Sequence, residues 1–74
     1  MSSQFRTTIA SPPDREKLVA EVFFGSEQVA EINQETGNLR IEIYPHSSGE
    51  PWVLPYQDFL IAVSDAKRRL VGDA

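Results

Sequence analysis

Residues 39–44 read LRIEIY, and this alternation of apolar and polar residues decides the fold class. A period of two residues is typical of a β-strand that has one buried face and one exposed face. Pro45 follows and should end the strand, because proline has no N–H to donate to a β-ladder. We therefore expect a sheet whose outward face carries Arg40, Glu42 and Tyr44.

Two further strand patterns precede this one, and each pair of strands is separated by a glycine turn. Residues 17–24 (KLVAEVFF) are rich in β-branched and aromatic residues, and residues 27–33 (EQVAEIN) follow them closely. The intervening Gly25-Ser26 suits a two-residue type II′ hairpin, and Gly37 in QETGN can adopt a positive φ. Together the three runs predict a three-stranded antiparallel meander.

The segment PYQDFLIAVSDAKRRLVG, residues 55–72, is the one convincing helix pattern in the chain. Pro55 is suited to the first turn, and Gly72 is a suitable C-cap. The basic triplet of residues 67–69 falls in the last turn, where cations favour the helix dipole, so it does not need a nucleic-acid interpretation. Apolar residues recur at helical spacing and predict a stripe that packs on the sheet: Phe59, Val63, Ala66 and Leu70, with Tyr56, Leu60 and Ala62 beside them.

The predicted fold class is α+β, a three-stranded antiparallel β-meander followed by one C-terminal α-helix packed on one face of the sheet. With 74 residues, the chain has room for one domain. We expect residues 1–14 to be a flexible leader, residues 15–72 to form the domain and residues 73–74 to be a tail. Thr7-Thr8-Ile9 leaves a short edge strand open, which would make the element order ββββα.

The turns predict which residues share a face of the sheet, because paired residues point to the same side. Pairing Ile32 with Ile41 creates one apolar face, which we expect beneath the helix: Ala30, Ile32, Leu39, Ile41 and Ile43. A regular register through Gly25-Ser26 places Leu18, Ala20, Val22 and Phe24 on the outer face, with Val19 and Phe23 toward the helix. A shift of one residue in either turn would exchange these assignments.

This outer face is thus partly apolar and partly acidic, and two interpretations stay open. An exposed apolar patch of this kind is typical of an interface with a partner. Alternatively, the leader or the loop that carries Trp52 folds over it. The Trp52 side chain itself is best interpreted as a lid over the edge of the core.

The charge is concentrated in the middle of the chain, whose formal net charge is −4. Between residues 21 and 58, seven acids (Glu21, Glu27, Glu31, Glu35, Glu42, Glu50 and Asp58) face one base, Arg40. This acidity argues against direct nucleic-acid binding and would attract a basic partner, although solubility alone also accounts for an acidic chain.

The absence of cysteine and the hydropathy of the chain indicate in which cellular compartment the protein resides. The chain has no cysteine, so it can form neither disulfides nor thiolate zinc sites, which fits a reducing cytoplasm. No segment approaches the roughly 20 apolar residues that a membrane span needs. We therefore predict a cytoplasmic protein that does not associate with membranes.

Catalytic patterns are weak, and we predict a non-catalytic protein without cofactor or metal. His46 and Ser47 are neighbours in a turn, but adjacency does not provide the geometry of a catalytic triad. Glu31 and Glu42 should lie opposite each other, as in a paired-carboxylate site, yet a single sheet offers little concavity for a substrate. We interpret them as a solvated or partner-facing pair, and predict a partner-binding surface of Glu31, Arg40, Glu42 and Tyr44.

Residues 29–70 also contain a series of short motifs: Ala30-Glu31-Ile32, Gly37, Ile41 to Pro45, Gly49 with Pro51-Trp52 and Leu54, and Ala66-Lys67 with Leu70. Over about residues 18–70 the chain resembles the small α+β immunity proteins of bacterial polymorphic-toxin systems. The resemblance implies that the protein neutralises a cognate toxin domain by direct binding, and the charge suggests a basic nuclease as that toxin. The alternative is a small self-associating module, a homodimer without a toxin partner.

Overall fold

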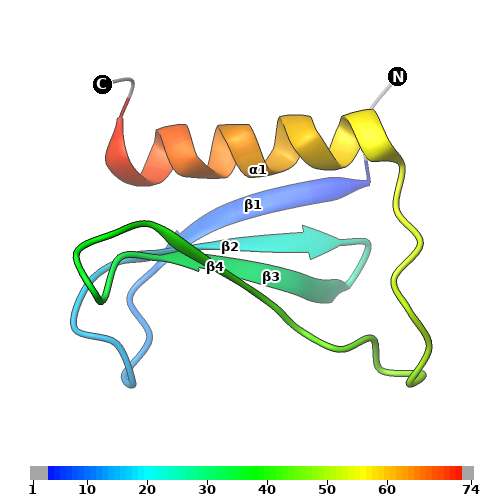
Figure 1. Cartoon of the computed structure of the whole chain (residues 1–74), viewed down its shortest axis with the longest axis horizontal. Helices are drawn as coiled ribbons and strands as arrows, with labels where there is room; N and C mark the ends of the chain where they lie inside the picture. Colours follow the sequence, from blue (N-terminus) through cyan, green and yellow to red (C-terminus); the bar gives the residue numbers. More distant parts are fainter. Residues whose placement is uncertain (1–3, 73–74) are drawn as a thin grey trace.

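The computed structural model describes residues 4–72 as a four-stranded antiparallel sheet followed by one helix (Figure 1). The strands lie in chain order and are β1 (Phe5–Ala10), β2 (Val19–Phe24), β3 (Glu27–Asn33) and β4 (Arg40–Ile43), and α1 spans Tyr56–Val71. The α+β class is confirmed, and β1 is the edge strand that the sequence left open. The domain therefore includes residues assigned to a leader, whose residues 1–3, like the predicted tail 73–74, lie outside the described part.

Turn and cap residues adopt the backbone conformations that their chemistry favours. Gly25 has a φ of 65° and no described non-glycine residue has a positive φ, which fits a type II′ turn between β2 and β3. Pro55 is the N-cap of α1 with a φ of −62°. At the other end, Gly72 has a φ of 88° and its N–H donates to the Arg68 carbonyl at 2.7 Å.

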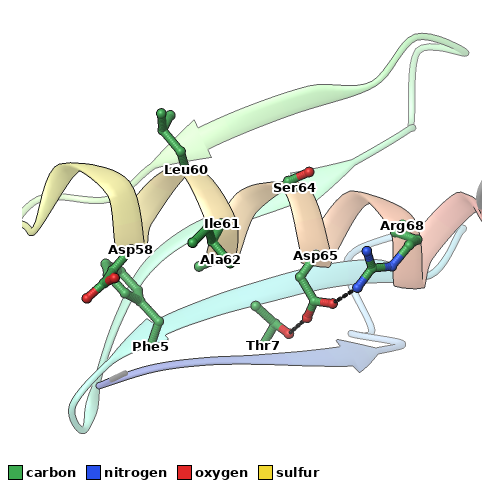
Figure 2. Close-up of a pocket in the computed structure, with 9 residues that line it drawn as sticks. All are labelled: Phe5, Thr7, Asp58, Leu60, Ile61, Ala62, Ser64, Asp65 and Arg68. Atoms are coloured by element: carbon green, nitrogen blue, oxygen red, sulfur yellow. Dashed lines mark hydrogen bonds and ion pairs between the residues drawn. The ribbon is translucent and has the colours of Figure 1, made fainter. Parts of the chain in front are cut away.

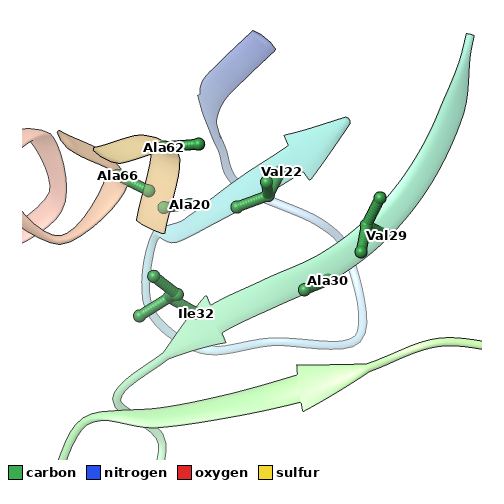
Figure 3. Close-up of a cluster of buried hydrophobic side chains, with 7 residues drawn as sticks. All are labelled: Ala20, Val22, Val29, Ala30, Ile32, Ala62 and Ala66. Atoms are coloured by element: carbon green, nitrogen blue, oxygen red, sulfur yellow. The ribbon is translucent and has the colours of Figure 1, made fainter. Parts of the chain in front are cut away.

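The core lies between α1 and the two central strands (Figure 3). Ala62 and Ala66 point from α1 toward the sheet, and Ala66 lies close to Ala20 of β2. Small side chains on both elements let the helix approach the sheet closely, so a few valine and isoleucine side chains complete the core. Its buried members are Ala20, Val22, Val29, Ala30, Ile32, Ala62 and Ala66.

A β-bulge in β3 reverses the face assignment that a regular register predicts for β2. Val22 pairs with Ala30 but Phe23 pairs with Gln28, so Val29 is an extra residue between the two pairs. Ala20 and Val22 therefore share the helix side of the sheet, contrary to the expectation that they face outward. Val29 is itself fully buried in the core.

The helix covers only part of the sheet, which corrects a second expectation. α1 contacts β1 and β2, while β4 has every residue exposed. Ala30 and Ile32 are buried as predicted, but Leu39, Ile41 and Ile43 are 41%, 46% and 60% exposed. The geometry explains this difference, since a helix of roughly 10 Å diameter spans about two strands spaced about 4.8 Å apart.

Polar contacts fasten the second half of α1 to β1. The Thr7 hydroxyl donates to Asp65 Oδ2 at 3.2 Å, and Arg69 Nη1 donates to the carbonyl and the hydroxyl of Thr7, both at 2.8 Å. Arg68 forms an ion pair with Asp65 at 2.5 Å. Two members of the basic triplet thus have structural partners, in line with the interpretation from sequence.

Trp52 closes the edge of the core, as the sequence predicts. Its ring packs against the core cluster, and its Nε1 donates to the Tyr44 carbonyl at 3.0 Å. The His46 ring contacts it edge-on with a centroid distance of 4.4 Å. The connection between β4 and α1 is thereby held against the sheet.

Candidate functional site

A row of carboxylates crosses the face of the sheet opposite the helix. Glu21, Glu31 and Glu42 are successive partners across β2, β3 and β4. We call these three residues the acidic row. On its β1 side, the Thr8 hydroxyl donates to Glu21 Oε1 at 3.1 Å. Directly opposed like charges destabilise a sheet unless something neutralises them, so the row requires a compensating group.

Arg15, from the loop between β1 and β2, supplies that compensation. Its Nη2 lies 2.9 Å from Glu31 Oε2 and 2.6 Å from Glu42 Oε2. The Glu31 side chain is only 7% exposed and that of Glu42 is 47% exposed. One guanidinium therefore bridges a buried carboxylate and a half-exposed one.

Two neighbours complete the hydrogen bonding of the buried carboxylate. Asn33 Nδ2 donates to Glu31 Oε2 at 3.1 Å and to Glu42 Oε2 at 2.7 Å. The Tyr44 hydroxyl donates to Glu31 Oε1 at 3.1 Å. Both oxygens of Glu31 are thus satisfied within the protein, as a buried charge requires.

The loop that carries Arg15 is held in place by Glu35 from the β3–β4 turn. The backbone N–H groups of Glu16 and Lys17 each donate to the Glu35 carboxylate at 3.1 Å. Arg15 N–H also donates to the Pro12 carbonyl at 3.2 Å. The guanidinium is consequently presented to the acidic row by a fixed backbone.

This network shifts the proton affinity of two of its members. Burial raises the pKa of the Tyr44 hydroxyl above 10, and the negative charge of Glu31 and its hydrogen bond to the phenol raise it further. Burial lowers the pKa of the Arg15 guanidinium, but the hydrogen bond to Glu42 and the surrounding carboxylates outweigh this and raise it. The network therefore favours the charged arginine and the neutral tyrosine.

We expect the stability of the protein to fall at high pH through Tyr44. The pKa of Tyr44 is raised in the folded state. The stability that the neutral hydroxyl contributes is therefore fully present below the pKa of the unfolded chain, about 10, and is lost as the pH rises through the pKa of the folded protein. Urea unfolding of the wild type and of Tyr44→Phe, measured from neutral pH to about pH 11, checks this. The wild type should lose more stability than the variant over that range, and equal losses would contradict the assignment.

The four predicted partner-binding residues do not share one environment. Glu31, Glu42 and Tyr44 are brought together in the network, while Arg40 pairs with Asn33 at the end of the β3–β4 ladder and is exposed. The network also contains Arg15 and Asn33, which are not among the four residues predicted from the sequence. Arg15 lies 27 residues from Glu42 in the sequence, and a single arginine in a loop carries no local signal of that contact.

The apolar part of the outer face is smaller than the sequence suggests. Phe23 lies under Arg6, whose guanidinium carbon is 4.4 Å from the ring centroid. Val19 is fully buried. On the helix side of the sheet, three apolar residues at the β4 edge are exposed, namely Leu39, Ile41 and Ile43, which we call the β4 patch.

A shallow depression lies between α1 and β1 (Figure 2). Phe5 and Thr7 line it from the strand, and the helix contributes residues that include Asp58, Asp65 and Arg68. Figure 2 shows that its central polar groups contact one another, because Asp65 bridges Thr7 and Arg68. The Thr7–Asp65 hydrogen bond is one of the contacts that fasten α1 to β1, and the Asp65–Arg68 pair lies within α1.

Among residues 4–72, no cluster of three histidine, cysteine, aspartate or glutamate side chains is placed to hold a metal ion. Over the same range, no helix is long and apolar enough to cross a membrane. Comparison of the chain with models of protein families, with curated proteins and with solved structures gave no match. The arguments for function therefore rest on the geometry of the protein and on its sequence motifs.

Proposed function

We propose that the protein is a non-catalytic binding protein, an immunity protein of the cytoplasm that neutralises a cognate toxin domain by direct binding. The observation that carries the proposal is the acidic row, in which Arg15 and Asn33 hold Glu31 and Glu42 in fixed positions and the Thr8 hydroxyl donates to Glu21. Fixed charges favour recognition, because a partner that meets them does not have to order them first. The resemblance to small immunity proteins supports the same conclusion.

The half-exposed Glu42 is the member of the row that can reach a partner, with Arg40 and Tyr44 beside it on the outer face. A toxin with a basic surface, such as the substrate groove of a nuclease, is the complementary partner. Attraction between the two surfaces would accelerate their encounter, and this acceleration would weaken as salt screens the charges.

The test begins with the tagged protein as bait in a bacterial lysate, at low and at moderate salt, read by mass spectrometry. The proposal requires a stoichiometric partner that is toxic when expressed alone and harmless when co-expressed with this chain. Recovery of the bait with no such partner would contradict it.

Once the partner is purified, Glu42→Lys tests the surface. We expect the association rate to fall by about tenfold, since the substitution reverses one charge of the contact surface. Glu50→Lys is the matched control, because it changes the net charge equally at an exposed loop residue outside the acidic row. Equal rates for the two variants would remove the outer face from the proposal.

A self-associating module is the second candidate function, and the exposed β4 edge is the observation that favours it. All four residues of β4 are exposed, and an unprotected edge strand is a template for pairing with another chain.

A further inference from the structure

We propose that β4 is the interface of a symmetric homodimer, in which it pairs antiparallel with β4 of a second copy about a two-fold axis at Ile41. This inference does not depend on the immunity function, since it concerns the chain alone. It joins the two four-stranded sheets into one continuous sheet and covers the edge that the monomer leaves open.

The backbone of β4 is oriented for such pairing. Tyr44 N–H donates to the Val29 carbonyl at 2.8 Å, and Tyr44 follows directly on the paired Ile43. Because hydrogen bonding alternates along an antiparallel ladder, Arg40, Glu42 and Tyr44 direct their N–H and C=O groups toward β3. The intervening Ile41 and Ile43 therefore direct theirs away from the sheet, toward the open edge.

Charge and Pro45 together select one register among those whose two-fold axis lies within β4. With the axis at Ile41, Ile41 pairs with its own copy, and Arg40 lies opposite the second copy's Glu42. An axis at Arg40 or at Glu42 would instead place like charges opposite each other, which is destabilising. An axis at Ile43 would place Ile41 opposite Pro45, which lacks an N–H.

The side chains on the helix side match in the same register. Leu39 lies opposite the second copy's Ile43, so the β4 patches of the two copies meet across the axis. These residues are between 41% and 60% exposed in the monomer. Arg40 and Glu42 occupy non-hydrogen-bonded positions, where side chains of opposing strands come closest and an ion pair forms most readily.

A five-residue edge is a small interface, so the dimer should be weak. Interfaces below about 1,200 Å² are typical of transient complexes, and we expect a dissociation constant on the order of tens to hundreds of micromolar. Sedimentation equilibrium should show a mass that rises with concentration toward twice 8.3 kDa. A protein that stays monomeric up to about 1 mM would overturn the proposal.

Charge reversal tests the register. Because two variants are compared alone and as a mixture, the result does not depend on the stability of one variant. In a homodimer of the Arg40→Glu variant, the new glutamate lies opposite Glu42 of the second copy. In a homodimer of the Glu42→Lys variant, the new lysine lies opposite Arg40 of the second copy. Each variant therefore opposes like charges and should dimerise at least tenfold more weakly. Mixed in equal amounts, the two variants regain opposite charges at both contacts and should recover the wild-type dissociation constant within about threefold. A mixture no better than its components would overturn the register.

Single cysteines test the position of the axis. The chain has no cysteine, so any disulfide dimer must form through the introduced residue. Ile41→Cys places two thiols at the axis, where paired Cα atoms lie about 5.5 Å apart and a disulfide can form. Ile43→Cys is the matched control, since its thiols lie several residues apart along the paired strands. Ile41→Cys should cross-link at least tenfold faster, and equal rates would overturn the proposal.

Discussion

Replacing Glu31 by alanine is expected to lower the free energy of unfolding by about 3 kcal/mol, because it breaks a buried, hydrogen-bonded charge cluster. The substitution removes the acceptor of the Tyr44 hydroxyl and one of the two carboxylates that bind Arg15. A 74-residue domain has about 4–11 kcal/mol of stability, so the loss is a large share of the total. Urea unfolding monitored by circular dichroism measures it.

Three further variants, Glu50→Ala, Arg15→Met and the double variant, separate charge pairing from the loss of a glutamate side chain. Glu50→Ala removes an exposed loop glutamate and should change stability by less than about 0.5 kcal/mol. Combining Glu31→Ala with Arg15→Met removes both charges, so the double variant should lose less than the sum of the two single losses. Strictly additive losses would show that Arg15 and Glu31 do not stabilise each other.

Replacing Ala66 by leucine is expected to cost about 2–3 kcal/mol through overpacking. Ala66 is fully buried and lies close to Ala20 in the core between α1 and the sheet, so the added carbons have no space. The helix must move away from β2, which also strains the contacts between α1 and Thr7. The measurement is the shift of the urea midpoint, which should move well below that of the wild type.

Lys67→Leu is the matched control for this substitution. Lys67 is the next residue of α1 and is exposed, so leucine there finds space without displacing the helix. It should change stability by less than about 0.5 kcal/mol. If Ala66→Leu were equally mild, the close approach of α1 to the sheet would not be essential to the fold.

Local patterns were sufficient to predict most elements of the fold. The strand Glu27–Asn33 has the predicted bounds, and α1 lies between Pro55 and Gly72 as the cap chemistry indicates. These elements carry their signals within a few residues, as alternation, turn glycines or helical spacing. The sequence predicts β1 only as an alternative to a flexible leader, since Thr7-Thr8-Ile9 is a short pattern without a turn signal before it.

What the sequence could not predict depends on three-dimensional packing. Nothing distinguishes Val29 from its neighbours as a bulged residue, yet one extra residue reverses the faces of β2. The extent of helix coverage likewise follows from where Ala62 and Ala66 dock, not from the spacing of the apolar stripe.

The candidate site was likewise predictable only where local sequence patterns determine it. The opposition of Glu31 and Glu42 follows from the turn at Gly37 and is confirmed. Their neutralisation by Arg15 does not follow, because the loop that presents it is ordered by contacts with Glu35 that span 18 and 19 residues. Long-range contacts between loops leave no periodic signal in a single sequence.

The attachment of α1 to β1 has a consequence for how the protein is made. The contacts of Thr7 with Asp65 and Arg69 join residues 58 and 62 positions apart, so they form only after nearly the whole domain has been synthesised. All four strands leave the ribosome before the helix does. Until α1 emerges, the nascent sheet exposes the apolar face around Ala20 and Val22, and exposed apolar surface of this kind is prone to aggregation.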